Sequence, residues 1–163
     1  MQVENSRINP SFFKIPTIIT SFSPEETQMA GKCLSNYLKE GDIVALRGTL
    51  GAGKTCFIKG IAKGLGISEE ITSPTYTIIS EYEGILPGTT PGEQKSLPFY
   101  HIDAYRLQGN DDFSAIGGEE IIYGKGISVI EWSDRIPDFI PPHAFKVDIE
   151  LQLGEKRIIH IYR

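Results

Sequence analysis

Residues 48–55 decide the fold, and they read Gly48-Thr49-Leu50-Gly51-Ala52-Gly53-Lys54-Thr55. This stretch matches the pattern G-x-x-x-x-G-K-[ST], which is typical of the phosphate-binding loop of nucleoside triphosphatases. Because glycines lack a Cβ atom, the backbone N–H groups of such a loop can turn inward and surround an anion. Lys54 is then a surface cation that reaches the β- and γ-phosphates, and Thr55 offers its hydroxyl to Mg²⁺. The residues of this stretch that we expect to bind the nucleotide are Gly48, Gly51, Ala52, Gly53, Lys54 and Thr55.

The segments on both sides of the loop support this interpretation. Residues 42–47 form a short apolar run with two β-branched side chains, which predicts a buried strand. After the loop, apolar residues recur at helical spacing as far as Leu65, and Gly64 and Gly66 end the predicted helix. A helix that begins near Lys54 adds its positive dipole end to the anion site. The alternative is a glycine-rich turn that binds nothing.

The bulk composition limits the classes of protein to consider. With 163 residues, the chain has room for a loose tail at 1–15 and a single P-loop domain at 16–163. The formal net charge of −5 disfavours unassisted binding to nucleic acid. The two cysteines, Cys33 and Cys56, resemble small hydrophobic residues in helical patterns. The sequence shows no signal-peptide pattern and no apolar run of about 18 residues, so we expect the cytoplasm as its compartment.

The chain before the loop predicts one strand and one helix. Residues 16–21 are rich in β-branched side chains and predict a short strand. Ser23 is suited to cap a helix, with a proline at the first helical position and Glu26 completing a capping box. The apolar stripe that follows predicts a helix to about Glu40, which Gly41 ends.

The chain after the loop predicts more strands than helices. A loop at Pro74 leads into strand-forming residues up to 82, and we expect a hairpin with an enlarged flexible tip at 84–97 and a strand at 99–103. A short helix at 111–123, broken at 117–118, is expected before a buried strand at 127–131. The chain is then expected to form a terminal hairpin of 145–153 and 157–162. Strands that alternate with helices around a glycine-rich loop predict the α/β class. The expected fold is a P-loop NTPase-like mixed β-sheet flanked by helices, with a C-terminal β-hairpin.

Two carboxylates end predicted strands. Asp103 follows the strand at 99–102, and Glu131 follows the strand at 127–130. In open α/β sheets the ligand lies at the carboxyl ends of strands, so both acids are expected beside Thr55. Hydrolysis of a nucleotide needs a carboxylate near the metal, which makes both acids candidate magnesium ligands. The alternative is that either one is a solvated acid at a strand end.

Other side chains near these acids have weaker indications. The segment 72–75 combines hydroxyls with a rigid proline and suggests a switch, although such residues also make ordinary turns. Arg106 and Arg135 are candidate cations, but structural salt bridges are the commoner role of single arginines. His101 lies inside a strand pattern, where a packed and hydrogen-bonded side chain is commoner than a base. Trp132 is expected either in the core or at the wall of a nucleotide pocket.

Together, these motifs resemble one family. The quoted stretch at 48–55 is followed by Ser73-Pro74-Thr75-Tyr76-Thr77, His101-Ile102-Asp103-Ala104-Tyr105-Arg106-Leu107 and Ile130-Glu131-Trp132. Their order and spacing resemble the TsaE family of tRNA threonylcarbamoyladenosine biosynthesis ATPases. The resemblance covers about residues 17–162, and the later motifs are more specific than the loop itself.

The resemblance implies an activity and its partners. It implies a bacterial ATPase that uses ATP and Mg²⁺ and works with the TsaB–TsaD pair. That pair transfers a threonylcarbamoyl group to adenosine 37 of tRNA, whereas the family member hydrolyses ATP in the assembly and meets tRNA only through it. No contact with a membrane is implied.

The resemblance also implies roles for individual residues. Thr55 and Glu131 are implied to hold Mg²⁺, with Asp103 close by or acting through water. The segment Ser73 to Thr75 is implied to face the γ-phosphate, and Thr27 is implied to lie near the base. The implied catalytic residues are Lys54, Thr75, Asp103 and Glu131, and Cys56 and Trp132 are implied to line the nucleotide.

The sequence departs from the family in two places and leaves two rivals open. The connection at 84–97 is longer than usual, and Cys56 replaces a small hydroxyl residue, although its backbone N–H remains available to a phosphate. A small-metabolite or nucleoside kinase is the rival enzyme, but it needs an arginine-bearing lid, and the sequence after the loop predicts strands. A nucleotide-gated binding module without hydrolysis is the other rival. A regulatory GTPase is excluded because the sequence contains no guanine-reading N-K-x-D element.

Overall fold

One mixed sheet organises the protein. The structure is a computed structural model that describes residues 8–88 and 90–163. In this part of the chain seven strands form a single sheet in the order β1-β7-β6-β2-β5-β4-β3. The strands are β1 (Thr17–Ser21), β2 (Ile43–Arg47), β3 (Ile79–Pro87), β4 (Gln94–Asp103), β5 (Ile127–Glu131), β6 (Phe145–Leu151) and β7 (Arg157–Tyr162).

The strand directions bring the carboxyl ends of three central strands together at one end of the sheet. The four central strands, β6, β2, β5 and β4, run parallel to one another. The outer strands β1, β7 and β3 pair antiparallel with their neighbours. The predicted mixed α/β sheet with a C-terminal hairpin is therefore confirmed, and the carboxyl ends of β2, β4 and β5 lie side by side, as ligand sites of such sheets require.

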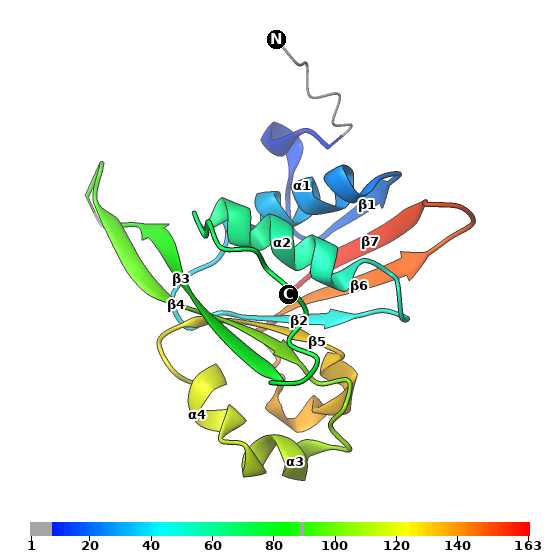
Figure 1. Ribbon diagram of the computed structural model, residues 1–163. Helices are drawn as coiled ribbons and strands as arrows, with labels where there is room; N and C mark the ends of the chain where they lie inside the picture. Colours follow the sequence, from blue (N-terminus) through cyan, green and yellow to red (C-terminus); the bar gives the residue numbers. More distant parts are fainter. Residues whose placement is uncertain (1–7, 89) are drawn as a thin grey trace.

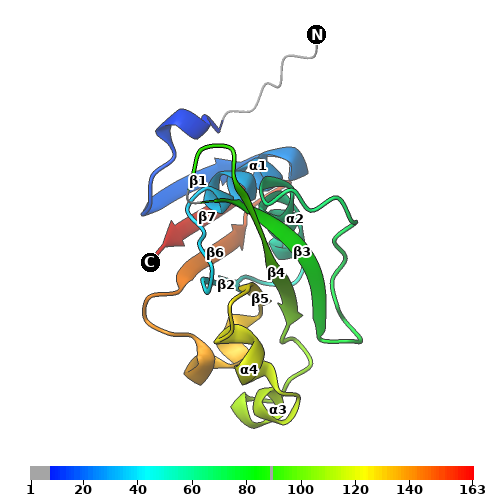
Figure 2. The ribbon, with the colours of Figure 1, turned by 90° about the vertical axis from the view of Figure 1, so that its left-hand side faces the viewer.

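Helices cover both faces of the sheet. Figure 1 shows α1 (Pro24–Ser35) and α2 (Lys54–Gly64) on one face, and α3 (Asn110–Ala115) and α4 (Gly118–Ile122) beyond the other face. Figure 2 shows the same arrangement after a quarter turn. Three short 3-10 helices complete the regular structure of the described residues: η1 (Pro10–Phe12), η2 (Ser133–Arg135) and η3 (Pro137–Phe139).

Residues of the central strand alternate between two hydrophobic clusters. In β2, Val44 and Leu46 pack with α1 and α2, whereas Ile43 packs with α3 and η3. Helices α1 and α2 approach closely because glycines face each other's backbone: a Cβ atom on Gly31 or Gly60 would lie 2.1 or 1.9 Å from a carbonyl oxygen of the other helix. Both faces of the parallel strands are thus buried, which is usual for parallel sheets.

Helix α1 begins as predicted but ends earlier. The Ser23 hydroxyl accepts a hydrogen bond from the Glu26 N–H, and the Glu26 carboxylate accepts one from the preceding Phe22 N–H. The prediction that this helix continues to about Glu40 is wrong, because α1 ends at Ser35. The later apolar residues pack from a turn instead: the Tyr37 hydroxyl donates to a carbonyl of the N-terminal segment, and Leu38 is buried.

The N-terminal segment is packed where the structure describes it. Of the predicted loose tail at 1–15, residues 1–7 lie outside the described residues. In residues 8–15, Ile8 and Phe13 are buried in the same cluster as α1 and α2. The Phe13 carbonyl oxygen also accepts a hydrogen bond from the Tyr37 hydroxyl, with 2.6 Å between the two oxygens. The described part therefore differs from the expectation of a loose tail, because two apolar side chains anchor it.

The predicted enlarged tip at 84–97 is mostly paired strand. Strands β3 and β4 pair continuously from Ile79 and Ile102 to Pro87 and Gln94, and Figure 1 shows their outer part projecting beyond the sheet. The prediction of a flexible connection over all of 84–97 is therefore wrong. Gly84, which the sequence suggests is a loop residue, is buried and packs toward Leu65 at the end of α2.

Candidate nucleotide-binding site

The loop at 48–53 connects β2 to α2 at the centre of the sheet. Gly53 immediately precedes the helix and has φ of +104°, a backbone conformation that residues with a side chain rarely adopt. The N–H groups of the first helical turn cannot bond within the helix, so they are available to a ligand at the loop. The predicted order of strand, loop and helix is confirmed, and the helix ends at Gly64 as predicted.

The side chain of Lys54 is buried, in contrast to the expected surface cation. Only 4% of the residue is exposed, because the chain lies under Trp132 with Nζ 4.0 Å from the centroid of that ring. Nζ donates hydrogen bonds to the carbonyls of Gly48 at 2.7 Å and Thr49 at 3.0 Å. An ammonium has three donors, so the loop fixes its position while one donor stays uncommitted among the described residues.

The electrostatic environment of Lys54 is mixed. Burial lowers the pKa of its ammonium, and the nearby carboxylates of Glu131, Asp103 and Asp134 act in the opposite direction. These acids therefore favour the charged form of the lysine inside a partly dry site. A fixed cation in such surroundings interacts with a phosphate more strongly than a solvated one.

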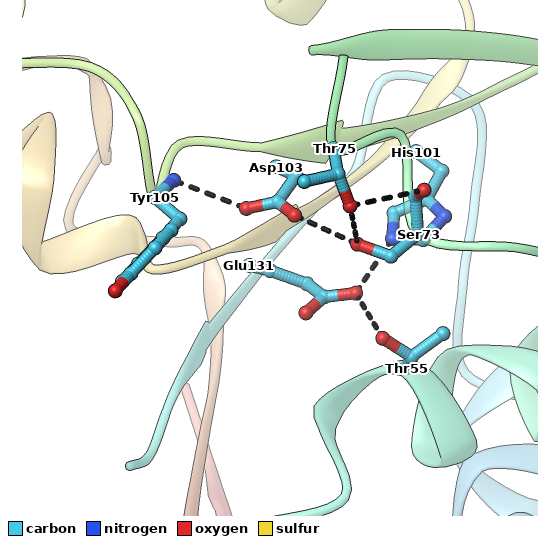
Figure 3. Close-up of polar contacts among 7 residues, drawn as sticks. All are labelled: Thr55, Ser73, Thr75, His101, Asp103, Tyr105 and Glu131. Atoms are coloured by element: carbon cyan, nitrogen blue, oxygen red, sulfur yellow. Dashed lines mark hydrogen bonds and ion pairs between the residues drawn. The ribbon is translucent and has the colours of Figure 1, made fainter. Parts of the chain in front are cut away.

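Thr55 and Glu131 form the central contact of the site. The Thr55 hydroxyl, in the first turn of α2, donates to Glu131 Oε1 at the end of β5 over 2.7 Å (Figure 3). A hydroxyl has one proton and two lone pairs. Because the proton is directed to the carboxylate, the lone pairs of the Thr55 oxygen remain available to a metal ion.

Asp103 lies next to Glu131 but has different partners. The two acids are directly opposite in the register of β4 and β5. Asp103 Oδ2 accepts a hydrogen bond from the Ser73 hydroxyl at 2.7 Å, and Oδ1 accepts one from the Tyr105 N–H at 3.0 Å (Figure 3). Of the two acids, Glu131 therefore contacts the loop helix, and Asp103 contacts the segment that the sequence indicates as a switch.

The segment from Ser73 to Ile78 is held at both ends. Thr75 Oγ1 lies 3.5 Å from Ser73 O and Oγ, which is too long for a strong hydrogen bond. Ile78 has φ of +66°, a rare and strained conformation for a β-branched residue. Its N–H donates to Pro74 O at 2.8 Å, and its carbonyl accepts the Asp103 N–H at 2.8 Å. The segment thus ends at a strained residue that is tied to β4.

Cation binding is compatible with these donors. The described residues contain no group of three or more His, Cys, Asp or Glu side chains that could hold a metal ion. Mg²⁺ commonly uses only one or two protein ligands together with substrate phosphates and water. The pair of Thr55 and Glu131 fits that pattern, and the action of Asp103 through water stays a prediction, supported by its register position opposite Glu131.

A sequence model of the family described as "Threonylcarbamoyl adenosine biosynthesis protein TsaE" matches residues 21–159. The chain belongs to the TsaE family. A TsaE protein of Treponema pallidum is 40% identical over 141 residues, which cover 86% of this chain and 96% of the relative. A TsaE protein of Bacillus subtilis is 38% identical over 138 residues, which cover 84% of this chain and 79% of the relative. Both relatives are named tRNA threonylcarbamoyladenosine biosynthesis protein TsaE.

A solved structure shows the same fold. The crystal structure of YdiB, whose source is given as Bacillus subtilus, is similar with a TM-score of 0.66 and 32% sequence identity. The similarity covers 91% of this chain and 87% of YdiB. The resemblance to the TsaE family and the predicted fold class are therefore confirmed. In the part of this TsaE chain that the structure describes, no helix is long and apolar enough to cross a membrane.

Most of the predicted site residues meet at the loop of this TsaE chain. The structure brings Thr55 into contact with Glu131 and Lys54 into contact with Trp132, and the strand register places Asp103 opposite Glu131. Trp132 is half-buried with φ of +57°, and its ring also packs 4.9 Å from the ring of Tyr105. Trp132 therefore lines the candidate site next to the loop and does not lie only in the core.

Two predicted nucleotide contacts have different surroundings. Thr27 is fully buried, and its hydroxyl lies 2.7 Å from the Ser21 hydroxyl. A Cβ atom on Gly53 would lie 3.8 Å from the Thr27 methyl carbon, so Thr27 lies next to the loop, and its place near the base stays a prediction. Cys56 is partly exposed in the first turn of α2, and its Sγ lies 3.2 Å from the Pro24 carbonyl. Burial raises the pKa of the Cys56 thiol.

Sequence reasoning missed Arg157. Its Nε donates to the Ala52 carbonyl in the loop at 2.9 Å, although the two residues are 105 positions apart. No spacing rule predicts this contact, because it depends on β7 returning beside β6 and β1. The two predicted candidate arginines lie on aromatic rings instead: Arg106 over Tyr76 and Arg135 over Tyr105.

Proposed function

We propose that this TsaE protein is a Mg²⁺-dependent ATPase that acts with the TsaB–TsaD pair in the threonylcarbamoyl modification of adenosine 37 of tRNA. The observation that carries the proposal is the 2.7 Å contact between Thr55 and Glu131. It joins the first turn of the loop helix to an acid at the end of a parallel strand, which is the combination that phosphoryl-transfer sites need. The names of the TsaE relatives support the place in tRNA modification.

The loop and Lys54 bind the phosphates in this proposal. The N–H groups around Gly53 and the start of α2 surround the anion, as far as the first-turn N–H of Cys56. The third donor of Lys54 is directed to the β- and γ-phosphates, because two loop carbonyls already hold the other two. Trp132 covers the ammonium and limits access of water to it.

Mg²⁺ would be held by the Thr55 oxygen and the Glu131 carboxylate, with Asp103 reached through water. When bound, the ion would neutralise charge on the phosphates and orient them for in-line attack. The protein's own contribution is to keep these oxygens in place before the ion arrives. The hydrogen bond from Thr55 to Glu131 supports this contribution.

Asp103 and the switch segment would orient the attacking water. Asp103 accepts hydrogen bonds from the Ser73 hydroxyl and the Tyr105 backbone N–H, so its carboxylate is fixed toward the segment that ends at Ile78. The contacts of the Thr75 hydroxyl to Ser73 are long, at 3.5 Å, which leaves this hydroxyl able to turn toward a γ-phosphate. We propose Asp103 and Thr75 as the residues that act on the water.

Partners are proposed to complete the site. Lys54 is the cation that lies at the loop centre, whereas Arg157 is committed to a loop carbonyl and Arg106 and Arg135 lie on rings. An arginine supplied in trans accelerates such reactions by roughly 10³–10⁵-fold. We therefore expect slow hydrolysis alone and faster hydrolysis with TsaB–TsaD. A net charge of −5 supports only indirect contact with tRNA, in the cytoplasm where tRNA is modified.

The test measures phosphate release from ATP by the protein alone, with tRNA only, and with TsaB–TsaD. We expect slow Mg²⁺-dependent release alone, no effect of tRNA only, and marked acceleration by the pair. Glu131→Gln is the matched control, because it keeps the shape of the side chain and removes its charge. Rapid release by the isolated protein that the pair leaves unchanged contradicts the proposed partnership.

The same assay separates the two rivals. A kinase gives a phosphorylated small acceptor in amounts equal to the ADP formed. The sequences of α3 and α4 argue against a kinase, because neither helix contains an arginine or lysine for a lid. A binding module without hydrolysis gives the same background release for the parent and for Glu131→Gln, with or without the pair.

A further inference from the structure

A buried histidine lies behind the central acid of the site. His101 is completely inaccessible to solvent, and its Nε2 lies 2.8 Å from Glu131 Oε1. The imidazole comes from β4, two residues before Asp103, and its register partner on β5 is Val129, two residues before Glu131. Figure 3 shows His101 above Glu131 and partly behind Ser73, whereas Thr55 lies below Glu131.

The other nitrogen of this imidazole has no hydrogen-bond partner in the described part of the chain. Nδ1 of His101 is buried and makes no hydrogen bond within the described residues. An unsatisfied polar atom in a dry interior costs stability. An apolar side chain of similar size would fill the same buried space without that cost. The bond from Nε2 to Glu131 is therefore the feature of His101 that an apolar residue could not supply.

Two donors meet on one carboxylate oxygen. Thr55 Oγ1 and His101 Nε2 both contact Oε1 of Glu131, at 2.7 and 2.8 Å. Because a carboxylate only accepts hydrogen bonds, Nε2 must carry the proton in this contact, and donors from two different elements then hold Oε1 and so limit the rotation of the whole carboxylate. Neither donor occupies Oε2, which leaves that oxygen available to a ligand at the loop.

We propose that His101 is a positioning residue that holds the Glu131 carboxylate, by donation from Nε2, in the orientation in which it receives a divalent cation beside Thr55. This inference rests on the proposed function, since it concerns the same cation. Groups that hydrogen-bond to metal ligands set the orientation of those ligands, and their loss commonly reduces metal affinity 10- to 100-fold. The imidazole itself touches neither nucleotide nor metal.

The test compares two variants of His101 by the Mg²⁺ dependence of ADP binding. His101→Leu removes the donor and keeps the position apolar, whereas His101→Gln places an amide N–H near the former Nε2. Calorimetry gives the ADP affinity in EDTA and over a series of Mg²⁺ concentrations. His160→Gln is the matched control, because this histidine is exposed on β7.

In His101→Leu, we expect the Mg²⁺ concentration that gives half of the change in ADP affinity to rise about tenfold. This is the size of effect that the loss of a hydrogen bond to a metal ligand commonly has. Its ADP affinity in EDTA should equal that of the parent, and His101→Gln should restore most of the response to Mg²⁺. An unchanged response in His101→Leu overturns the inference. Equal losses with and without Mg²⁺, or failure of His101→Gln to restore the response, also overturn it, because they indicate a purely structural role.

A spectroscopic measurement keeps this inference separate from the proposed function. Imidazole ¹⁵N shifts in the nucleotide-free protein should show His101 with its proton on Nε2 and with Nδ1 unprotonated, and Glu131→Gln should shift both signals. The chain has three histidines, and the signals that are absent from the His101→Gln spectrum are those of His101. The opposite tautomer overturns the positioning role alone. ADP binding by the parent that does not respond to Mg²⁺ overturns the proposed function and this inference together.

Discussion

Replacement of Lys54 by methionine should weaken ATP binding while the protein remains folded. Methionine keeps an unbranched apolar stem beneath Trp132 and removes only the charged end. The change therefore deletes the two hydrogen bonds to Gly48 and Thr49 and the proposed contact to phosphate. Alanine is a poorer choice, because Lys54 is only 4% exposed and a truncated side chain leaves a cavity under the ring.

The expected magnitudes follow from these contacts. A hydrogen bond from a charged donor to phosphate contributes about 1.5–3 kcal/mol, which corresponds to a loss of roughly 10- to 150-fold in ATP affinity. The two loop carbonyls lose their partner as well, so the free energy of unfolding should fall by about 1–3 kcal/mol. A typical domain remains folded after such a loss.

Calorimetry with ATP and Mg²⁺ measures the affinity, and urea unfolding followed by circular dichroism measures the stability. Lys63→Met on the same helix is the matched control, because Lys63 is exposed and contacts the Gln28 side chain. It should bind ATP like the parent. Parent-like ATP affinity in Lys54→Met would refute the assignment of residues 48–55 as the phosphate-binding loop.

Three further predictions concern residues around the loop. Asp103→Asn should bind ATP within threefold of the parent but release phosphate at least tenfold more slowly with TsaB–TsaD, and parent-like release would remove Asp103 from the reaction. Arg157→Met should lower the free energy of unfolding by about 1–2 kcal/mol in urea, since a buried loop carbonyl loses its donor; an unchanged midpoint would contradict this. In a Cys33→Ala background, Cys56 should react with iodoacetamide more slowly than free cysteine at pH 8, because its raised pKa leaves less thiolate. ATP with Mg²⁺ should slow this reaction further. Equal rates with and without ATP would show that Cys56 does not lie at the nucleotide site.

The sequence predicts the centre of the site well because its signal is local. Eight consecutive residues define the loop, and the strand before it and the helix after it have clear periodicity. Asp103 and Glu131 are found because parallel strands bring their carboxyl ends together, which is a rule of the fold class and not of the individual chain. The register of β4 and β5 places these two acids directly opposite each other, as that rule requires.

The errors arise where tertiary contacts decide the local structure. Helix α1 was predicted to reach Glu40, but Tyr37 and Leu38 leave the helix to anchor the N-terminal segment and the core. The segment at 84–97 was predicted as an enlarged tip from its glycines and prolines, but packing of Gly84 toward Leu65 of the α2 end keeps both strands paired. Neither contact is visible within a window of neighbouring residues.

The environment of each functional side chain was the least predictable property. Lys54 was expected at the surface and is buried, because the ring of Trp132 covers it, and the sequence does not specify the left-handed backbone at that tryptophan. Arg157 was not predicted to contact the loop, since it reaches Ala52 only through the return of β7. Such contacts require the whole sheet to be assembled first.

The most direct measurement for the central claim is a crystal structure of this protein with Mn²⁺ and a non-hydrolysable ATP analogue, using the anomalous signal of manganese. We predict one strong anomalous peak within bonding distance of Thr55 Oγ1 and at the Glu131 carboxylate, with the triphosphate enclosed by residues 48–55. A triphosphate bound away from the loop, or a metal peak that contacts neither Thr55 nor Glu131, would contradict the account.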